Sequence, residues 1–106
     1  MKRVEDYNYS YNHVKQRLRE IYNIKRFSLR EYDYMNQMVR IYRRYNEICN
    51  RDGKRYQHHI PIWMDRDGDQ ECWAYLKYNV VYSRSKDRVI TVLELDNVNK
   101  EEYKGE

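Results

Sequence analysis

Apolar side chains recur at helical spacing through residues 27–53. Ser28 and Glu31 form a capping box, which predicts that a helix begins at about Leu29, and Gly53 supplies a residue suited to its end. We expect this helix to bury one broad stripe and to leave its opposite face in water. The stripe comprises Met35, Met38, Tyr42, Tyr45 and Cys49, widened by Tyr34, Ile41 and Ile48.

A second apolar line lies ahead of this stretch and predicts a first helix over residues 11–24. Asp6 and Ser10 are the two candidate caps for its start. The apolar line consists of Tyr7, Tyr11, Val14, Leu18 and Ile21. Because the link between the two helices is only about three residues long, at 25–27, we expect an antiparallel pair packed face to face.

Past the second helix the apolar period changes from about 3.6 residues to 2, which is typical of β-strands. Residues 56–64 predict an edge strand, because Pro61 cannot donate a hydrogen bond to a neighbouring strand. Residues 72–82 predict one long strand, and the β-branched run 88–95 predicts a third. The turns between these strands are expected at residues 65–69 and 83–87.

Together these elements predict an α+β fold. In it, an N-terminal antiparallel helical hairpin packs on one face of a three-stranded antiparallel β-meander. The 106 residues fit a single domain, since a chain of this length buries one modest core. We expect the helical hairpin at 1–53, the meander at 54–96 and a polar tail at 97–106.

Composition narrows the class of protein. Apolar residues make up 41% of the chain and charged residues 36%, which is compatible with a folded globule. No apolar run approaches the roughly 18 residues that a membrane span needs, and the first residues lack the apolar core of a signal peptide. We therefore expect a soluble cytoplasmic protein without a membrane partner, located in the host cytoplasm if a phage encodes it.

Positive charge is concentrated in the helical half. Residues 1–50 carry 11 Lys and Arg against 6 Asp and Glu, whereas residues 51–96 carry 8 of each. Arginine outnumbers lysine by 13 to 8, and a guanidinium stacks on rings and pairs with carboxylates or phosphates better than an ammonium does. This distribution favours a role in recognition.

Metal and cofactor chemistry find little support in the sequence. Asp65, Asp67 and Asp69 alternate as in a calcium loop, but Leu76 stands where an EF-hand needs its bidentate Glu, so a solvated turn is the better interpretation. Cys49 and Cys72 have no CxxC spacing, and we expect both to be reduced, buried thiols. We predict no metal and no cofactor.

One segment suggests a catalytic alternative. Residues 82–88, followed by a β-rich strand, resemble locally the closing hairpin of small metal-independent toxin ribonucleases, in which side chains hold a scissile phosphate and move a proton. His58 and His59 are neighbours on a predicted strand and should point to opposite faces, so at most one could act there. The catalytic set of this alternative is His58 or His59, with Tyr82, Arg84, Lys86 and Arg88.

The 13 tyrosines carry the main functional prediction. So many large rings exceed what a small core should hold, so several are expected on the surface, where Tyr and Trp beside Arg are typical of binding hot spots. The predicted partner-binding residues are Tyr7, Tyr9, Tyr11, Arg40, Arg43, Arg44, Tyr56, Trp73 and Tyr75. The same mixture also suits single-stranded nucleic acid, with Lys25 and Arg26 added to the three arginines.

The sequence therefore favours a small, non-enzymatic partner-binding protein of the phage or mobile-element type. Its partner is expected to be a protein, and a nucleic-acid-handling enzyme is one candidate. Inhibition of a host defence nuclease by steric occlusion is the specific hypothesis. A metal-independent ribonuclease and a nucleic-acid-binding module are the alternatives. Both a monomer and a homodimer are compatible with the predicted edge strand.

Overall fold

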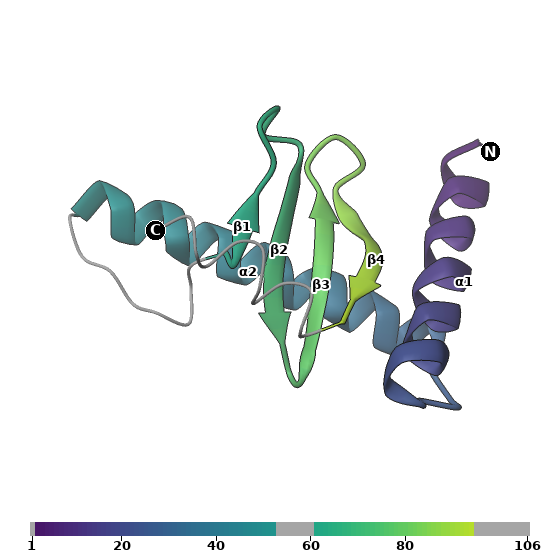
Figure 1. Cartoon of the computed structure of the whole chain (residues 1–106). Coiled ribbons are helices and arrows are strands. Elements are labelled where there is room, and N and C mark those ends of the chain that lie inside the picture. Colours follow the sequence, from purple (N-terminus) through teal and green to yellow (C-terminus); the bar gives the residue numbers. More distant parts are fainter. Residues whose placement is uncertain (1, 53–60, 95–106) are drawn as a thin grey trace.

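The computed structural model describes residues 2–52 and 61–94, with side chains described for 6–49 and 61–94. It confirms the α+β class and adds one strand to the prediction, since the sheet has four antiparallel strands in the order β1-β2-β3-β4 (Figure 1). The helices are α1 (Lys2–Tyr22) and α2 (Leu29–Asp52), and the strands are β1 (Trp63–Met64), β2 (Gln70–Tyr75), β3 (Tyr78–Ser83) and β4 (Arg88–Leu93).

The extra strand arises because the single strand expected at 72–82 is two strands. The chain reverses at Leu76 and Lys77, so that Tyr75 pairs with Tyr78. Leu76 has a φ of 54°, a conformation that turns usually assign to Gly, Asn or Asp. None of these residues stands at the turn itself, so the alternating apolar pattern runs through it without interruption.

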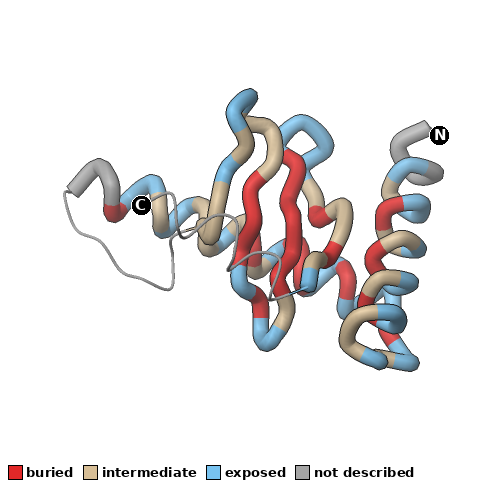
Figure 2. The backbone as a smooth tube through the Cα atoms, in the orientation of Figure 1, coloured by how far each residue is buried: buried red, intermediate tan, exposed pale blue. Residues whose placement is uncertain are grey.

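Helix α2 crosses one face of the sheet and supplies much of the core. The predicted capping box is present: the Ser28 N–H donates to Glu31 Oε1 at 2.9 Å, and the Glu31 N–H donates to Ser28 Oγ at 3.1 Å. The buried core that α2 shares with the sheet includes Tyr32, Met35 and Val39 from the helix and Trp73, Val80, Tyr82, Val89 and Val92 from the strands. Figure 2 shows the buried parts of β2 and β3 in red, over the helix.

Helix α1 ends two residues earlier than predicted and begins well before residue 11. Asn23 follows it with a φ of 58°, and the Ile24 N–H donates back to the Leu18 carbonyl in the last turn of the helix at 3.2 Å. The left-handed Asn23 therefore ends the helix and turns the chain before α2 begins.

The predicted face-to-face helical hairpin is wrong. Helix α1 lies beside β4, at the end of the sheet, while α2 runs across the strands (Figure 1). The reason is the open edge of β4, whose backbone groups need partners. Arg17 Nε donates to the Val92 carbonyl at 3.4 Å, and the Tyr22 hydroxyl donates to the Leu93 carbonyl at 2.9 Å, so α1 closes this edge with its side chains.

Helix α2 also forms hydrogen bonds with the backbone of β4. The Val89 N–H donates to Asn36 Oδ1 at 2.7 Å, and the Tyr32 hydroxyl donates to the Val89 carbonyl at 2.6 Å. Both side chains are fully buried. A β-bulge in β4, marked by the shift of register between Val81 and Tyr82, accompanies this arrangement.

Some predictions fall on residues outside the described part. The strand expected at 56–64 corresponds to the short β1 at Trp63–Met64, while 53–60 and the tail at 97–106 lie outside the described residues. Within the described residues, neither helix combines the length and the apolar character that crossing a membrane requires.

Candidate functional site

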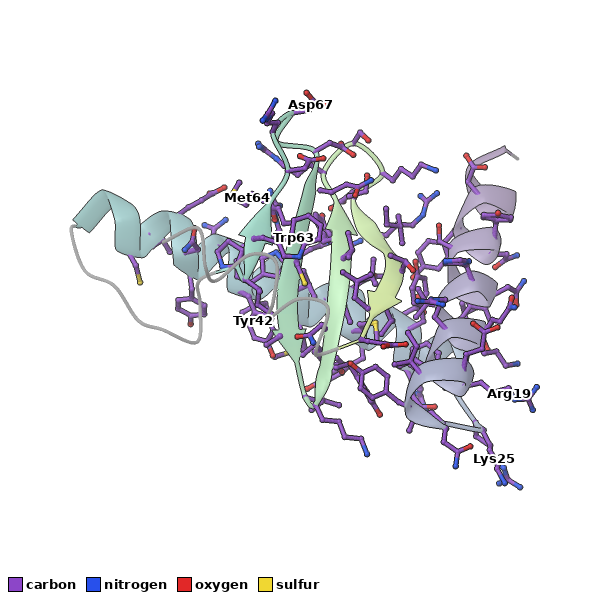
Figure 3. The ribbon with its side chains drawn as sticks, in the orientation of Figure 1. Arg19, Lys25, Tyr42, Trp63, Met64 and Asp67 are labelled. Atoms are coloured by element: carbon purple, nitrogen blue, oxygen red, sulfur yellow. The ribbon has the colours of Figure 1, made fainter. Side chains whose placement is uncertain are left out.

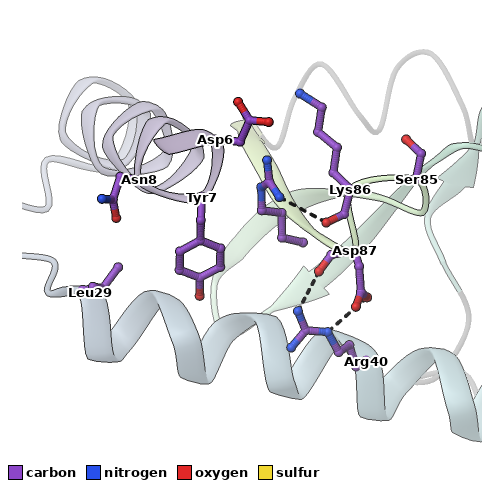
Figure 4. Close-up of a pocket in the computed structure, with 9 residues that line it drawn as sticks. Asp6, Tyr7, Asn8, Leu29, Arg40, Ser85, Lys86 and Asp87 are labelled. Carbon is purple, nitrogen blue, oxygen red and sulfur yellow. Dashed lines mark hydrogen bonds and ion pairs between the residues drawn. The ribbon is translucent and has the colours of Figure 1, made fainter. Parts of the chain in front are cut away.

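A cleft of about 790 Å³ opens between α1, α2 and the turn that joins β3 to β4 (Figure 4). It brings together Lys86 and Arg88 of the ribonuclease alternative with Arg40 of the partner-binding prediction. The lining residues are Asp6, Tyr7, Asn8, Leu29, Arg40, Ser85, Lys86, Asp87 and Arg88. The chemistry of the cleft depends on whether these charged groups are available to a ligand.

Arg40 is committed to the β3–β4 turn. Its Nε lies 3.1 Å from Asp87 Oδ1, and its Nη2 donates to the Asp87 carbonyl at 2.6 Å. The buried Tyr82 donates its hydroxyl to the same Asp87 carboxylate. Asp87 has a φ of 56°, and these contacts hold the turn in that conformation.

Arg88 joins the turn to α1. Its Nε donates to Ser10 Oγ at 2.9 Å, its Nη1 donates to the Lys86 carbonyl at 3.2 Å, and its guanidinium lies 6.0 Å from the centre of the Tyr7 ring. Lys86 itself is exposed at the rim. The cleft is therefore mainly a polar junction between three parts of the fold.

Tyr7 extends this junction to α2. Its hydroxyl donates to Asp33 and accepts a bond from Asn36 Nδ2 at 3.3 Å, and its ring packs 5.1 Å from that of Tyr32. Burial, followed by the bond to Asp33, raises the pKa of Tyr7 above its ordinary value. A phenol held neutral in this way is suited to a structural role.

The other residues of the ribonuclease set do not gather in the cleft. Arg84 turns to the loop between β1 and β2, where its Nη1 donates to the Gly68 carbonyl at 3.2 Å and its Nε lies 3.9 Å from Glu71 Oε2. Tyr82 is buried and bonded as described above. His58 and His59 lie outside the described residues.

The predicted partner-binding residues are divided between surface and interior. Tyr9 and Arg44 are exposed, whereas the expected exposure of Trp73 and Tyr75 is wrong, because both are buried against α2. Tyr56 lies outside the described residues. Among the 11 tyrosines that the structure describes, only Tyr9, Tyr34 and Tyr45 are exposed. The core therefore absorbs more rings than the sequence led us to expect.

Tyr11 and Arg43, two of the predicted partner-binding residues, make their polar contacts within the fold. The Tyr11 hydroxyl donates to the Phe27 carbonyl at 2.6 Å. Arg43 Nε lies 2.7 Å from Glu71 Oε1, which also accepts the Trp73 Nε1–H at 3.0 Å, and the Arg43 guanidinium stacks 4.8 Å from the centre of the Tyr82 ring. Glu71 is buried, so this ion pair is part of the fold.

The basic residues of the nucleic-acid alternative do not form one surface. Lys25 extends from the connection between the helices, away from the rest of the molecule (Figure 3), and Arg26 is exposed in the same connection. Arg40 and Arg43 instead pair with carboxylates at the sheet, as described above. Their charges are largely neutralised within the fold.

The predicted burial of the whole apolar stripe of α2 is wrong, because one row of it is exposed. Its members follow one another at spacings of four, three, four and three residues, the pattern of a coiled-coil seam. Four of the five are between 37% and 56% exposed, and the fifth, Met38, is partly buried. We call this set the α2 stripe: Tyr34, Met38, Ile41, Tyr45 and Ile48.

An apolar pocket of about 450 Å³ adjoins the stripe at Tyr34. Leu76, at the left-handed turn between β2 and β3, forms part of its wall and is 77% exposed. The remaining lining residues are Ile24, Phe27, Arg30, Glu31, Tyr75 and Tyr78. We call this hollow the stripe-end pocket.

Comparison with known proteins gives no further guide, because no protein-family model, curated protein or solved structure matches the chain. In the part of the chain that the structure describes, no group of three or more His, Cys, Asp and Glu side chains is placed to hold a metal ion. Function is therefore inferred from the geometry of the cleft and of the α2 stripe.

Proposed function

We propose that the protein is a non-enzymatic binding domain that holds an α-helix of a partner protein along the α2 stripe. The observation that carries this proposal is the exposure of Tyr34, Ile41, Tyr45 and Ile48 on one side of a single helix. Isolated apolar residues are common on protein surfaces, but a contiguous row is typical of an interaction site.

The spacing of the stripe supports a helix as the occupant. Side chains that alternate by three and four residues fit between the side chains of a second helix with the same repeat. From Tyr34 to Ile48 the stripe is about 21 Å long at 1.5 Å per residue, which corresponds to about four helical turns of contact. The stripe-end pocket lengthens this apolar surface beyond Tyr34.

The geometry of α2 also makes the stripe accessible. The helix has 24 residues and is about 36 Å long, whereas four strands span only about 14 Å from the first to the last. Its C-terminal end therefore extends past β1, as Figure 1 shows. A partner helix can lie along the exposed stripe without displacing a strand.

The cleft supports catalysis less well. Arg40 and Arg88 hold the β3–β4 turn against the helices, and Tyr82 is buried beneath it. The ribonuclease alternative predicts metal-free cleavage of RNA that is lost in an Arg88→Ala variant of retained fold. We expect the purified protein to leave RNA intact, and cleavage with that dependence would overturn a purely binding function.

The proposal is tested with a designed peptide. A labelled amphipathic helix of about three heptads, with Leu at its a and d positions and Gln on its flanks, should bind and change the polarisation of its fluorescence. Ile41→Asp should weaken this binding at least about tenfold, because a carboxylate would lose its water against the peptide. Asn12→Asp on the exposed side of α1 is the matched control. Equal binding by wild type and Ile41→Asp, or no binding by either, would refute the proposal.

The identity of the partner is a narrower question. From the composition, a nucleic-acid-handling enzyme is one candidate, and the specific hypothesis is a host defence nuclease that a phage protein would inhibit by steric occlusion. A domain that binds a helix could inhibit its partner sterically by covering a hinge or a channel. This part of the hypothesis stays a prediction from composition.

A further inference from the structure

We infer that the partner helix is acidic along one border, and that an apolar side chain at its end enters the stripe-end pocket. This inference rests on the proposed function and adds the charge of the partner and an anchor for one of its ends. It starts from the residues that border the α2 stripe on either side.

One border of the stripe is basic. Arg30, Gln37 and Arg44 recur every seven residues, in the heptad position before each a position, and all three are exposed. Neither Arg30 nor Arg44 forms an ion pair with any residue that the structure describes, in contrast to Arg40 and Arg43. Two uncompensated guanidinium groups therefore follow the stripe, two heptads apart.

The opposite border is not available for charge pairing. Its heptad positions are held by Met35, Tyr42 and Cys49. Met35 and Cys49 are buried, and the half-buried Tyr42 packs its ring 6.3 Å from that of Trp73. Residues on the borders of a helical interface set the choice of partner, and here only the basic border can do so.

A second copy of this chain fits this pattern poorly. In an antiparallel pair of α2 helices, the two rows that contain Arg30 and Arg44 would face each other, and like charges would repel. In a parallel pair, each basic row would face the row of Met35 and Tyr42, which is directed into the fold. A helix from another protein, with Asp or Glu opposite the basic border, meets neither obstacle.

The stripe-end pocket gives this partner an anchor. Arg30 lines the pocket beside Phe27 and Tyr78, so an apolar side chain could enter while a neighbouring carboxylate pairs with Arg30. Glu31 also lines the pocket, but its carboxylate accepts the Ser28 N–H of the capping box. Arg30 has no such bond to a described residue, so its guanidinium is available to a carboxylate of the ligand.

The test compares three peptides that share the apolar a and d residues and differ only on their flanks, which carry Glu, Gln or Lys. We expect the Glu peptide to bind the wild-type protein about tenfold more tightly than the Lys peptide, with a smaller difference at high salt. The double variant Arg30→Glu with Arg44→Glu should reverse this order. The double variant Arg19→Glu with Arg66→Glu makes the same change in net charge at exposed sites away from the stripe and should preserve it.

The outcomes separate this inference from the proposed function. Equal binding of all three peptides, lost in Ile41→Asp, would overturn the acidic partner and leave helix binding in place. No binding of any peptide would overturn both. A dimer in sedimentation measurements that Ile41→Asp dissociates would identify a second copy as the occupant and would also overturn the inference.

Discussion

Arg43 and Arg44 are neighbours in the sequence, yet they belong to different flanks of helix α2. Arg43 lies 2.7 Å from the buried Glu71 and stacks on Tyr82, whereas Arg44 is exposed beside the α2 stripe. The first flank joins the helix to the strands and turns of the sheet. The second carries apolar and basic side chains that are exposed. Residue type alone therefore does not identify the binding surface, and the direction of each side chain decides its role.

The largest expected difference between the flanks is in stability. Met35 is fully buried between α2 and the sheet, so Met35→Ala should lower the free energy of unfolding by about 2–5 kcal/mol. Ile41→Ala on the exposed stripe should change it by no more than about 0.5 kcal/mol. Urea unfolding followed by circular dichroism measures both. Similar losses for the two variants would show that the stripe is part of the core.

The next largest effect is expected at high pH, where ionisation of the buried Tyr32 should lower the stability of the fold. Burial raises the pKa of Tyr32 from 10.0 to about 12. The folded state thus keeps the phenol protonated longer than the unfolded state does. The stabilisation is complete below the unfolded value and is lost as pH rises through the folded one, by up to about 1.4 kcal/mol for each pH unit in that window.

A Tyr32→Phe variant tests this assignment. It removes the titrating group together with the 2.6 Å bond to the Val89 carbonyl, so it should be less stable than wild type near neutral pH. The difference should shrink between about pH 10 and 12, as wild type loses the contribution of Tyr32. A difference that stays constant across this window would mean that Tyr32 does not cause the alkaline loss.

The two neighbouring arginines provide a smaller and more direct comparison. Arg43→Ala removes one partner of the buried Glu71 carboxylate, which keeps the Trp73 Nε1–H, and should destabilise the protein by about 1.5 kcal/mol. Arg44→Ala should leave stability unchanged and should instead weaken the binding of an acidic partner helix. Thermal unfolding and peptide binding, measured on both variants, should give opposite patterns. The same pattern in both would remove the distinction between the flanks.

Local signals made much of α2 predictable. The capping box at Ser28 and Glu31 depends on residues three apart, and both of its bonds are present. The same sequence could not decide which side of the helix faces the sheet. Two apolar rows run along α2 at helical spacing, one through Tyr32, Met35 and Val39 and the other forming the α2 stripe. Periodicity predicts that such rows exist, but only packing against the strands selects the one that is buried.

The remaining errors have the same origin in tertiary structure. The turn at Leu76 has no Gly or Asn to mark it, and once the chain reverses there, Trp73 and Tyr75 become core residues instead of surface ones. The apolar line of α1 predicts packing on α2, but the position of α1 is set by hydrogen bonds to the edge of β4. From the sequence, only Lys86 and Arg88 could be assigned to one cluster of the cleft. Arg40 lines the same cleft but comes from a distant part of the chain.

The smallest expected effect concerns the contact between the β1–β2 loop and the β3–β4 turn, at one end of the sheet. Asp69 accepts the Ser85 N–H at 2.9 Å and the Ser83 hydroxyl at 3.1 Å, and the bonds from Ser85 are the main cause that lowers the pKa of its carboxyl. A lowered pKa means that the stabilisation is present above the unfolded value and is lost as pH falls through the folded one. Wild type should therefore be slightly more stable than Asp69→Asn at neutral pH, and the two should converge in acid. Because Asp69 is partly exposed, the difference should also shrink with salt, whereas the loss caused by Met35→Ala should not. A difference that persists below the folded pKa of Asp69 would show that the two turns are joined by the shape of this side chain and not by its charge.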